Sequence, residues 1–184
     1  AVANHFVLFF LGIETLSISL YILIAFQRSK SNSIEAGIKY LILASVSSAF
    51  LLFGMALIYT ALGTMQFGAI VAVLGTGDQL SPLVITGFGM MMVGIGFKLA
   101  LVPFHMWTPD VYQGAPAPVS AYIATVSKGA VMAIMIRFFF NIRGFDNHYL
   151  FVAISGIAIL SMFVGNILAI RQKNIKRLLG YSSI

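Results

Sequence analysis

The chain has 184 residues, of which 60% are hydrophobic and only 9% are charged. Soluble domains are about 45–50% apolar and about 25% charged, so this composition excludes a soluble globular domain. The formal charge is +6, but the basic residues stand between apolar runs and form no continuous stripe, which argues against nucleic acid as a partner.

Long, unbroken apolar runs predict an all-α integral membrane protein, because the strands of a transmembrane barrel are short and alternate. A spanning helix needs ~20 apolar residues. Five segments are long enough: 4–26, 35–62, 81–103, 117–140 and 148–170. No linker divides them, so we expect a single transmembrane domain over residues 1–184. We also expect this domain to be a fragment of a longer subunit.

The first predicted helix, 4–26, carries Glu14 at its midpoint. An ionised side chain at the centre of a bilayer costs roughly 2.5–3.5 kcal/mol on insertion scales. Ser17 and Tyr21 follow on the same helical face. We interpret Glu14 as a titrating group on an ion path, and a static buried ion pair is the alternative.

The second predicted helix, 35–62, carries Lys39 about two turns from its start. Asn32 is predicted to cap this helix, with Glu35 closing a capping box. Glu35 also precedes Lys39 by four residues, in the favourable orientation for an ion pair. An interfacial pair whose ammonium group reaches water is therefore an alternative to a buried role for Lys39.

The third predicted helix carries Lys98, the most informative ionisable residue. Five residues later, Pro103 lacks the N–H that would bond the carbonyl of Leu99. One straight helix over residues 81–113 would be about 50 Å long, too long for a ~30 Å membrane core. The helix is therefore predicted to break near Pro103, and a broken helix in a membrane is tolerated where it lines a polar cavity.

His105 follows Lys98 by seven residues, ~10 Å along a helix axis, so the two could exchange protons through one or two waters. The alternative for His105 is an interfacial position beside Trp107 in an aromatic belt. Glycines at seven-residue spacing on the same helix predict close contact with a neighbouring helix: Gly87 and Gly94, and Gly89 and Gly96.

Lys128 lies near the midpoint of the fourth predicted helix, 117–140, and is interpreted like Glu14: a titrating group, or a static packing residue. The fifth predicted helix, 148–170, has no charged residue. We interpret it as scaffold, although it contains Ser155, Ser161 and Asn166.

Basic residues in the connectors predict the orientation of the bundle. Six lie on one side: Arg28, Lys30, Arg171, Lys173, Lys176 and Arg177. The other side has only Arg137 and Arg143, so the first side is predicted to be cytoplasmic, or the equivalent negative side. With no cysteine and three histidines, we expect no metal and no redox centre on this chain.

Residues 97–120, FKLALVPFHMWTPDVYQGAPAPVS, closely resemble the antiporter-like membrane subunits of respiratory complex I, and most of all their N-type members. Three further stretches fit the same pattern: FLGIE at 10–14, EAGIKY at 35–40 and NIKRLLGYSS at 174–183. The resemblance covers essentially the whole chain.

The resemblance implies an antiporter-like fold of two inverted five-helix repeats, of which this chain would be the first. It further implies that Glu14 and Lys39 form an interacting pair that modulates proton affinity. Lys98, on the broken helix, would be the central proton carrier, and His105 and Lys128 would lie on the connecting relay.

The function implied by the resemblance is that of a proton-translocating subunit of an NADH:quinone oxidoreductase, in a bacterial inner membrane or an equivalent energy-coupling membrane. FMN, iron–sulfur clusters and quinone would be held by other subunits, and neighbouring antiporter-like subunits and the lipid bilayer would be the partners. Two alternatives stay open: a subunit of a multi-subunit cation/proton antiporter or membrane-bound hydrogenase, and a non-pumping assembly subunit.

Overall fold

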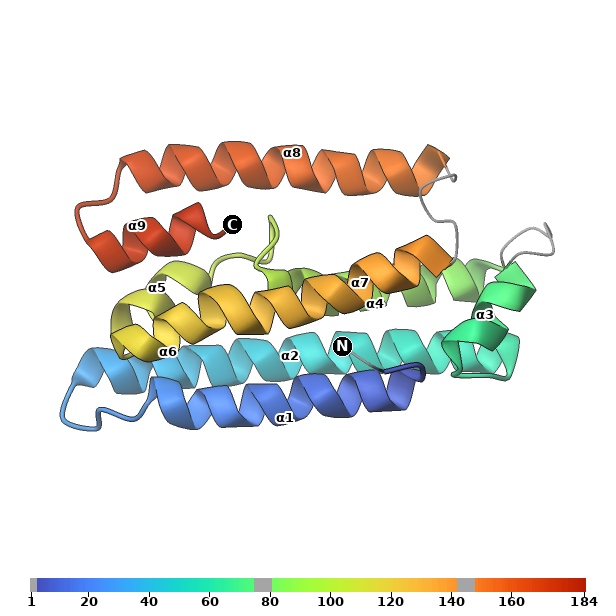
Figure 1. The fold of residues 1–184 in the computed structure, drawn as a ribbon, viewed down its shortest axis with the longest axis horizontal. Helices are drawn as coiled ribbons and strands as arrows, with labels where there is room; N and C mark the ends of the chain where they lie inside the picture. Colours follow the sequence, from blue (N-terminus) through green and yellow to red (C-terminus); the bar gives the residue numbers. More distant parts are fainter. Residues whose placement is uncertain (1–2, 75–80, 142–147) are drawn as a thin grey trace.

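The computed structural model describes residues 3–74, 81–141 and 148–184, and every regular element in these ranges is a helix (Figure 1). Five of the described helical segments are long and apolar enough to cross a membrane: Phe6–Ile24, Ser31–Leu62, Pro82–Leu99, Ala117–Asn141 and Phe151–Ile170. The predicted all-α membrane fold with five spans is confirmed, with helix ends that differ from prediction by at most four residues.

Several shorter helices accompany the five spans. In chain order the elements are α1 (Phe6–Ile24), α2 (Ser31–Leu62), α3 (Phe67–Leu74), α4 (Pro82–Leu99), α5 (Thr108–Gly114), α6 (Ala117–Tyr122), the π-helical turn η1 (Ile123–Ser127), α7 (Lys128–Asn141), α8 (His148–Ile170) and α9 (Ile175–Ser182). The elements α6, η1 and α7 follow one another directly and form the fourth span. The sequence did not predict α3, which lies in a connector rich in Gly and Thr.

The long helix α2 joins several parts of the bundle. It packs along α4 and also contacts α1 and α5, while α9 lies between α5 and α8 (Figure 1). Helix α8 lies at the edge, and only 11% of its spanning window is buried. Most of its apolar surface is therefore left to contact lipid or further protein.

The start of α2 differs from prediction. The helix begins at Ser31 and Lys30 occupies the N-cap position without a side-chain capping bond, so Asn32 lies inside the first turn and does not cap the helix. The reason is the neighbouring helix. Ser33 Oγ donates to the carbonyl of Ile24 at the end of α1, at 2.6 Å, which draws the chain into α2 immediately after the turn.

The third span is interrupted, as predicted, but it ends at Leu99, four residues before Pro103. Ala100 has a left-handed backbone (φ 59°), and the N–H of Leu101 donates to Gly96 O at 2.8 Å, which closes the last turn. The N–H of Val102 donates to Ser161 Oγ of α8 at 3.0 Å. The chain then enters α5 at Thr108.

The apolar core consists of two clusters. One joins α1, α2, α3, α4 and α7 and contains Phe6, Phe67 and Phe138. The other joins α1, α2, α4, α5 and η1 and contains Tyr40 and Trp107. In the last turn of α4, Leu99 belongs to the first cluster and Phe97 to the second. Lys98, between them in the sequence, lies where the two clusters meet.

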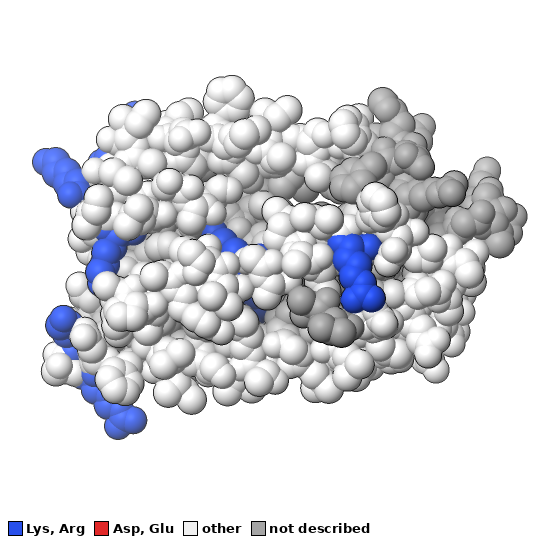
Figure 2. All heavy atoms as spheres, in the orientation of Figure 1, with Lys and Arg blue, Asp and Glu red and all other residues white. Residues whose placement is uncertain are grey.

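The described basic connectors lie together at one end of the bundle. The α1–α2 and α8–α9 connectors are at the same end in Figure 1, and Lys and Arg side chains gather there in Figure 2. Arg137 of α7 lies away from this end. It donates a hydrogen bond to Oδ1 of Asn4, just before the start of α1. Arg143 lies outside the described residues.

The contact between α2 and α4 predicts opposite effects for two glycines of α4. A Cβ on Gly94 would lie 2.7 Å from Leu51 Cβ and 2.9 Å from Ser47 O, whereas a Cβ on Gly89 would meet nothing within 4 Å. We expect Gly94→Ala to lower the free energy of unfolding by about 1–3 kcal/mol through overpacking. Gly89→Ala is the control, and we expect it to leave stability unchanged or slightly raised.

The measurement is thermal unfolding of the full-length protein in detergent. Equal stability of the two variants would contradict the close approach of α2 and α4.

Candidate functional site

Lys98 is held inside the bundle in the last turn of α4, with only 5% of its surface exposed. Its ammonium group donates a hydrogen bond to Ser17 Oγ of α1, and Ser17 Oγ donates in turn to Ile13 O at 2.7 Å. Lys98 Nζ also lies 5.8 Å from the ring centroids of Tyr40 and Phe97. One hydroxyl and two aromatic rings therefore surround this buried cation.

Glu14 lies one turn before Ser17 on α1, and its Oε1 accepts a hydrogen bond from Ser48 Oγ of α2. The predicted polar face of α1 is thus the face against which Lys98 packs. Glu14 and Ser17, which is the partner of Lys98, thus lie one turn apart on this face, and each bonds a side chain of another helix. Ser48 carried no signal in the sequence that pointed to this contact.

Lys39 is half-exposed near the start of α2 and forms two ion pairs. Its Nζ lies 2.6 Å from Glu35 Oε1 and 2.9 Å from Asp110 Oδ2 of α5. The structure does not bring Lys39 to Glu14. Ser48, the partner of Glu14, is nine residues further along α2, which is ~13 Å along a helix axis. The i,i+4 ion pair with Glu35, which the alternative interpretation of Lys39 predicted, is present.

Asp110 connects Lys39 to α9. Arg177 Nη1 of α9 lies 2.7 Å from Asp110 Oδ1 and donates to Gln113 Oε1 at 2.9 Å. Burial alone would raise the pKa of Asp110, but the hydrogen bonds and positive charges of Lys39 and Arg177 outweigh burial and lower it. The partners are 71 and 67 residues away in the sequence, so local spacing gave no sign of them.

His105 lies in the loop between α4 and α5, and it is buried, as is Trp107. Trp107 Nε1 donates to Phe97 O at 2.9 Å, so this residue packs inside the bundle and not in an interfacial belt. His105 Nδ1 and Thr108 Oγ1 are buried without a hydrogen-bond partner among the described residues. No contact in the described part of the chain joins His105 to Lys98.

Lys128 begins α7 immediately after the π-helical turn η1. Its Nζ donates to Ser183 O at 2.5 Å and to Ser183 Oγ at 3.0 Å, and Ser183 Oγ lies 3.1 Å from Tyr112 Oη. The structure thus joins Lys128 to α9 and α5. Within the described ranges, no group of three His, Cys, Asp or Glu residues could hold a metal ion.

Comparison with known proteins assigns residues 3–184 to the family model described as "NADH:quinone oxidoreductase/Mrp antiporter, TM". A similar curated protein is the NADH-quinone oxidoreductase subunit N of Nitrosospira multiformis, which is 54% identical over 99% of this chain and 36% of its own length.

Two solved structures are similar to the chain. Respiratory complex I from Thermus thermophilus, solved with bound aureothin, has a subunit that matches 98% of the chain at 37% identity and a TM-score of 0.78, over 38% of that subunit. The archaeal membrane-bound sulfane sulfur reductase matches 99% of the chain at 29% identity and a TM-score of 0.85, over 37% of the matched subunit. The chain spans little more than a third of the length of these relatives.

The ion pairs of Asp110 predict a difference between two charge-neutralising variants. Asp110→Asn removes the partner shared by Lys39 and Arg177, whereas Glu35→Gln removes only an exposed i,i+4 pair. Because these groups are partly exposed, we expect Asp110→Asn to lower the free energy of unfolding by about 1 kcal/mol and Glu35→Gln to lower it by a smaller amount. Thermal unfolding of the full-length protein measures both.

The acid titration of the same protein provides a second measurement. Because the folded-state pKa of Asp110 is lowered, its contribution is fully present above the ordinary carboxyl pKa of about 3.9 and is lost only as the pH falls through the lowered value. Equal destabilisation by the two variants would contradict the bridging role of Asp110.

Proposed function

Since this chain belongs to the NADH:quinone oxidoreductase/Mrp antiporter membrane family, we propose that it is the first five-helix repeat of a proton-translocating subunit of a respiratory NADH:quinone oxidoreductase. The observation that carries the proposal is Lys98, buried at the interrupted end of a membrane helix and bonded to Ser17 beside Glu14. An inert scaffold has no reason to keep a cation there.

Lys98 is proposed to gain and lose the translocated proton. The Ser17 hydroxyl, the nearby Glu14 carboxylate and the C-terminal end of α4 favour the ammonium form, whereas removal from water favours the neutral amine. These opposing influences let a buried lysine change its protonation state with small movements of its surroundings. A shift of Ser17 relative to Lys98 is one such movement.

His105 and Lys128 are proposed to pass the proton onward. His105 Nδ1 is buried with no protein partner in the described ranges, and so is the neighbouring Thr108 hydroxyl, which leaves both free to bond water. From Lys128 the proposed proton path continues through the Ser183 and Tyr112 hydroxyls, whose oxygens lie 3.1 Å apart. Lys39 lies outside this path, in the Asp110 ion-pair cluster. Its charge is proposed to modulate the proton affinity of Lys98.

The electron-transfer chemistry is proposed to occur on other subunits, which would hold FMN, iron–sulfur clusters and quinone. Neighbouring antiporter-like membrane subunits are the proposed partners, in a bacterial inner membrane or an equivalent energy-coupling membrane. A place in another member of the family, such as a cation/proton antiporter or a membrane-bound hydrogenase, is the second candidate. The TM-score of 0.85 to the archaeal sulfane sulfur reductase, another respiratory membrane complex, supports this second candidate.

Lys98→Ala tests the proposal directly. In the assembled complex, reconstituted in vesicles, we expect this variant to largely abolish proton pumping, because no other described cation occupies the end of α4. Lys173→Ala, at an exposed position in the α8–α9 connector, is the matched control and is expected to pump normally. Protons moved per NADH oxidised are measured by pH-dye quenching. Unchanged stoichiometry in Lys98→Ala would favour a non-pumping assembly role.

Ser17→Ala tests whether the hydroxyl positions the Lys98 ammonium. Losing a hydrogen bond to a charged group costs about 1.5–3 kcal/mol, so we expect pumping to fall by roughly tenfold or more. Ser19→Ala is the matched control, because Ser19 is exposed and its hydroxyl bonds no described residue other than Thr15, through Thr15 O of its own helix.

Ser17→Thr keeps the hydroxyl and is expected to restore pumping. Equal pumping by Ser17→Ala and Ser19→Ala would show that the Ser17 hydroxyl is not needed.

A further inference from the structure

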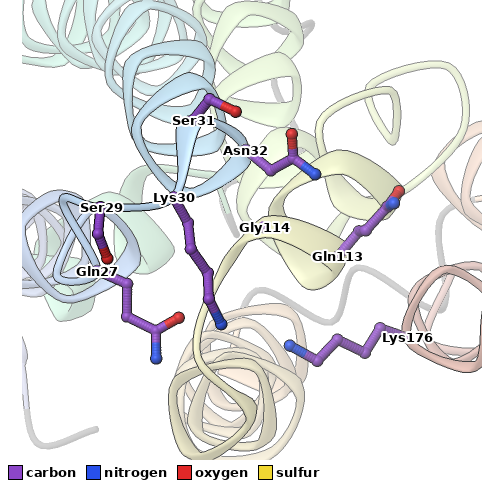
Figure 3. A pocket seen from close by; sticks show the side chains of 8 residues that line it. All are labelled: Gln27, Ser29, Lys30, Ser31, Asn32, Gln113, Gly114 and Lys176. Carbon is purple, nitrogen blue, oxygen red and sulfur yellow. The ribbon is translucent and has the colours of Figure 1, made fainter.

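A polar pocket of about 310 Å³ lies at the basic end of the bundle, away from the buried lysines. Three segments form it: the turn from α1 into α2 with the first residues of α2 (27 and 29–32), the end of α5 (Gln113 and Gly114) and Lys176 of α9 (Figure 3). All but Gly114 of these residues have polar side chains, in a protein that is 60% hydrophobic.

The charge of the pocket is entirely positive. Lys30 and Lys176 line it, no carboxylate does, and Figure 3 shows the two ammonium groups directed toward the same open space. Lys176 Nζ donates to Ala115 O at 2.8 Å, and the Lys30 ammonium has no partner among the described residues. The nearby Asp110 carboxylate is engaged by Lys39 and Arg177. Two cations that face one pocket without a counterion attract an anion.

Neutral donors add to the two lysines. The backbone N–H groups of Ser31 and Asn32, in the uncapped first turn of α2, have no partner within the described ranges. Both residues line the pocket, together with the amide side chain of Gln27. An anion with several acceptor oxygens fits such a set of donors better than a single carboxylate does.

We propose that this pocket binds the phosphate of an anionic phospholipid headgroup. The two lysines and the neutral donors favour a phosphate group as the ligand. The position of the pocket indicates that this phosphate belongs to a lipid. The pocket lies at the end of the spanning helices where the described basic connectors gather, the position at which anionic lipids attract Lys and Arg. Phe26, adjacent to Gln27, is 72% exposed, and Ile22, one turn earlier, is 66% exposed, which offers an apolar surface to an acyl chain.

The test uses the membrane assembly that contains the full-length chain, delipidated and then titrated with isotope-labelled phosphatidylglycerol. Native mass spectrometry counts the lipids bound to each assembly. Each lysine near an anionic headgroup contributes about fivefold in affinity, so Lys30→Gln with Lys176→Gln is expected to weaken binding at one site by about 25-fold.

The matched control is Arg28→Gln with Lys173→Gln, which removes the same charge from the same end but outside the pocket. We expect it to bind labelled lipid as the wild type does. The single variant Lys30→Gln, expected to show about a fivefold loss, tests the pocket without disturbing the bond from Lys176 to Ala115 O.

Three outcomes would overturn the proposal. Unchanged lipid binding in the pocket variants would show that no headgroup occupies the pocket. An equal loss in the control would show general attraction of anionic lipid to this end of the bundle. Displacement of the labelled lipid by inorganic phosphate at low millimolar concentration would assign the pocket to free phosphate, whereas resistance to displacement supports the lipid.

Discussion

The structure depends on ending α4 inside the bundle, where several of the backbone groups at the break find partners. In a membrane, each unpaired peptide group costs several kcal/mol. Gly96 O accepts from Leu101 N, Phe97 O accepts from the Trp107 indole, and Val102 N donates to Ser161 Oγ. These partners come from the loop itself, from ten residues along the chain and from another helix, so the break is held by the whole bundle.

The same break explains why Lys98 is where it is. A helix that ends inside the protein places the negative end of its dipole there, and Lys98 occupies its last turn. The loop that follows contains His105 and Trp107, α5 begins with Thr108, and all three residues are buried. Interrupting the helix therefore supplies both electrostatic support for a cation and space for polar side chains beyond it, two requirements that an unbroken apolar helix does not meet.

The sequence predicted features that depend on neighbouring residues along the chain, and it missed contacts that depend on how the helices pack. Hydropathy predicted the five spans, and Pro103 predicted the interruption, although the helix ends four residues earlier, at Leu99, where the left-handed Ala100 follows. Of the two ion-pair partners of Lys39, only Glu35 was predicted, because the second partner, Asp110, is brought near by tertiary packing. Glu14 and Lys98 were found because charges are rare in apolar runs.

Serine contacts gave no such signal. Serine is common in membrane helices, so Ser48 and Ser161 did not stand out. Their bonds, to Glu14 and to Val102 N at the end of α4, depend on how the helices are rotated, which composition does not reveal. The interpretation of 148–170 as scaffold therefore leaves out one buried hydroxyl, that of Ser161, which is 3% exposed.

The short helix α9 is held by contacts near both of its ends. Arg177, in its first turn, is bound to Asp110 at the edge of the bundle, and Ser183, just past its end, receives the ammonium of Lys128. Arg177 and Ser183 are six positions apart, which is about 9 Å along a helix axis. Because both contacts are made through one short helix, a movement of α9 that loosened the outer ion pair would also displace the acceptor that holds the inner lysine.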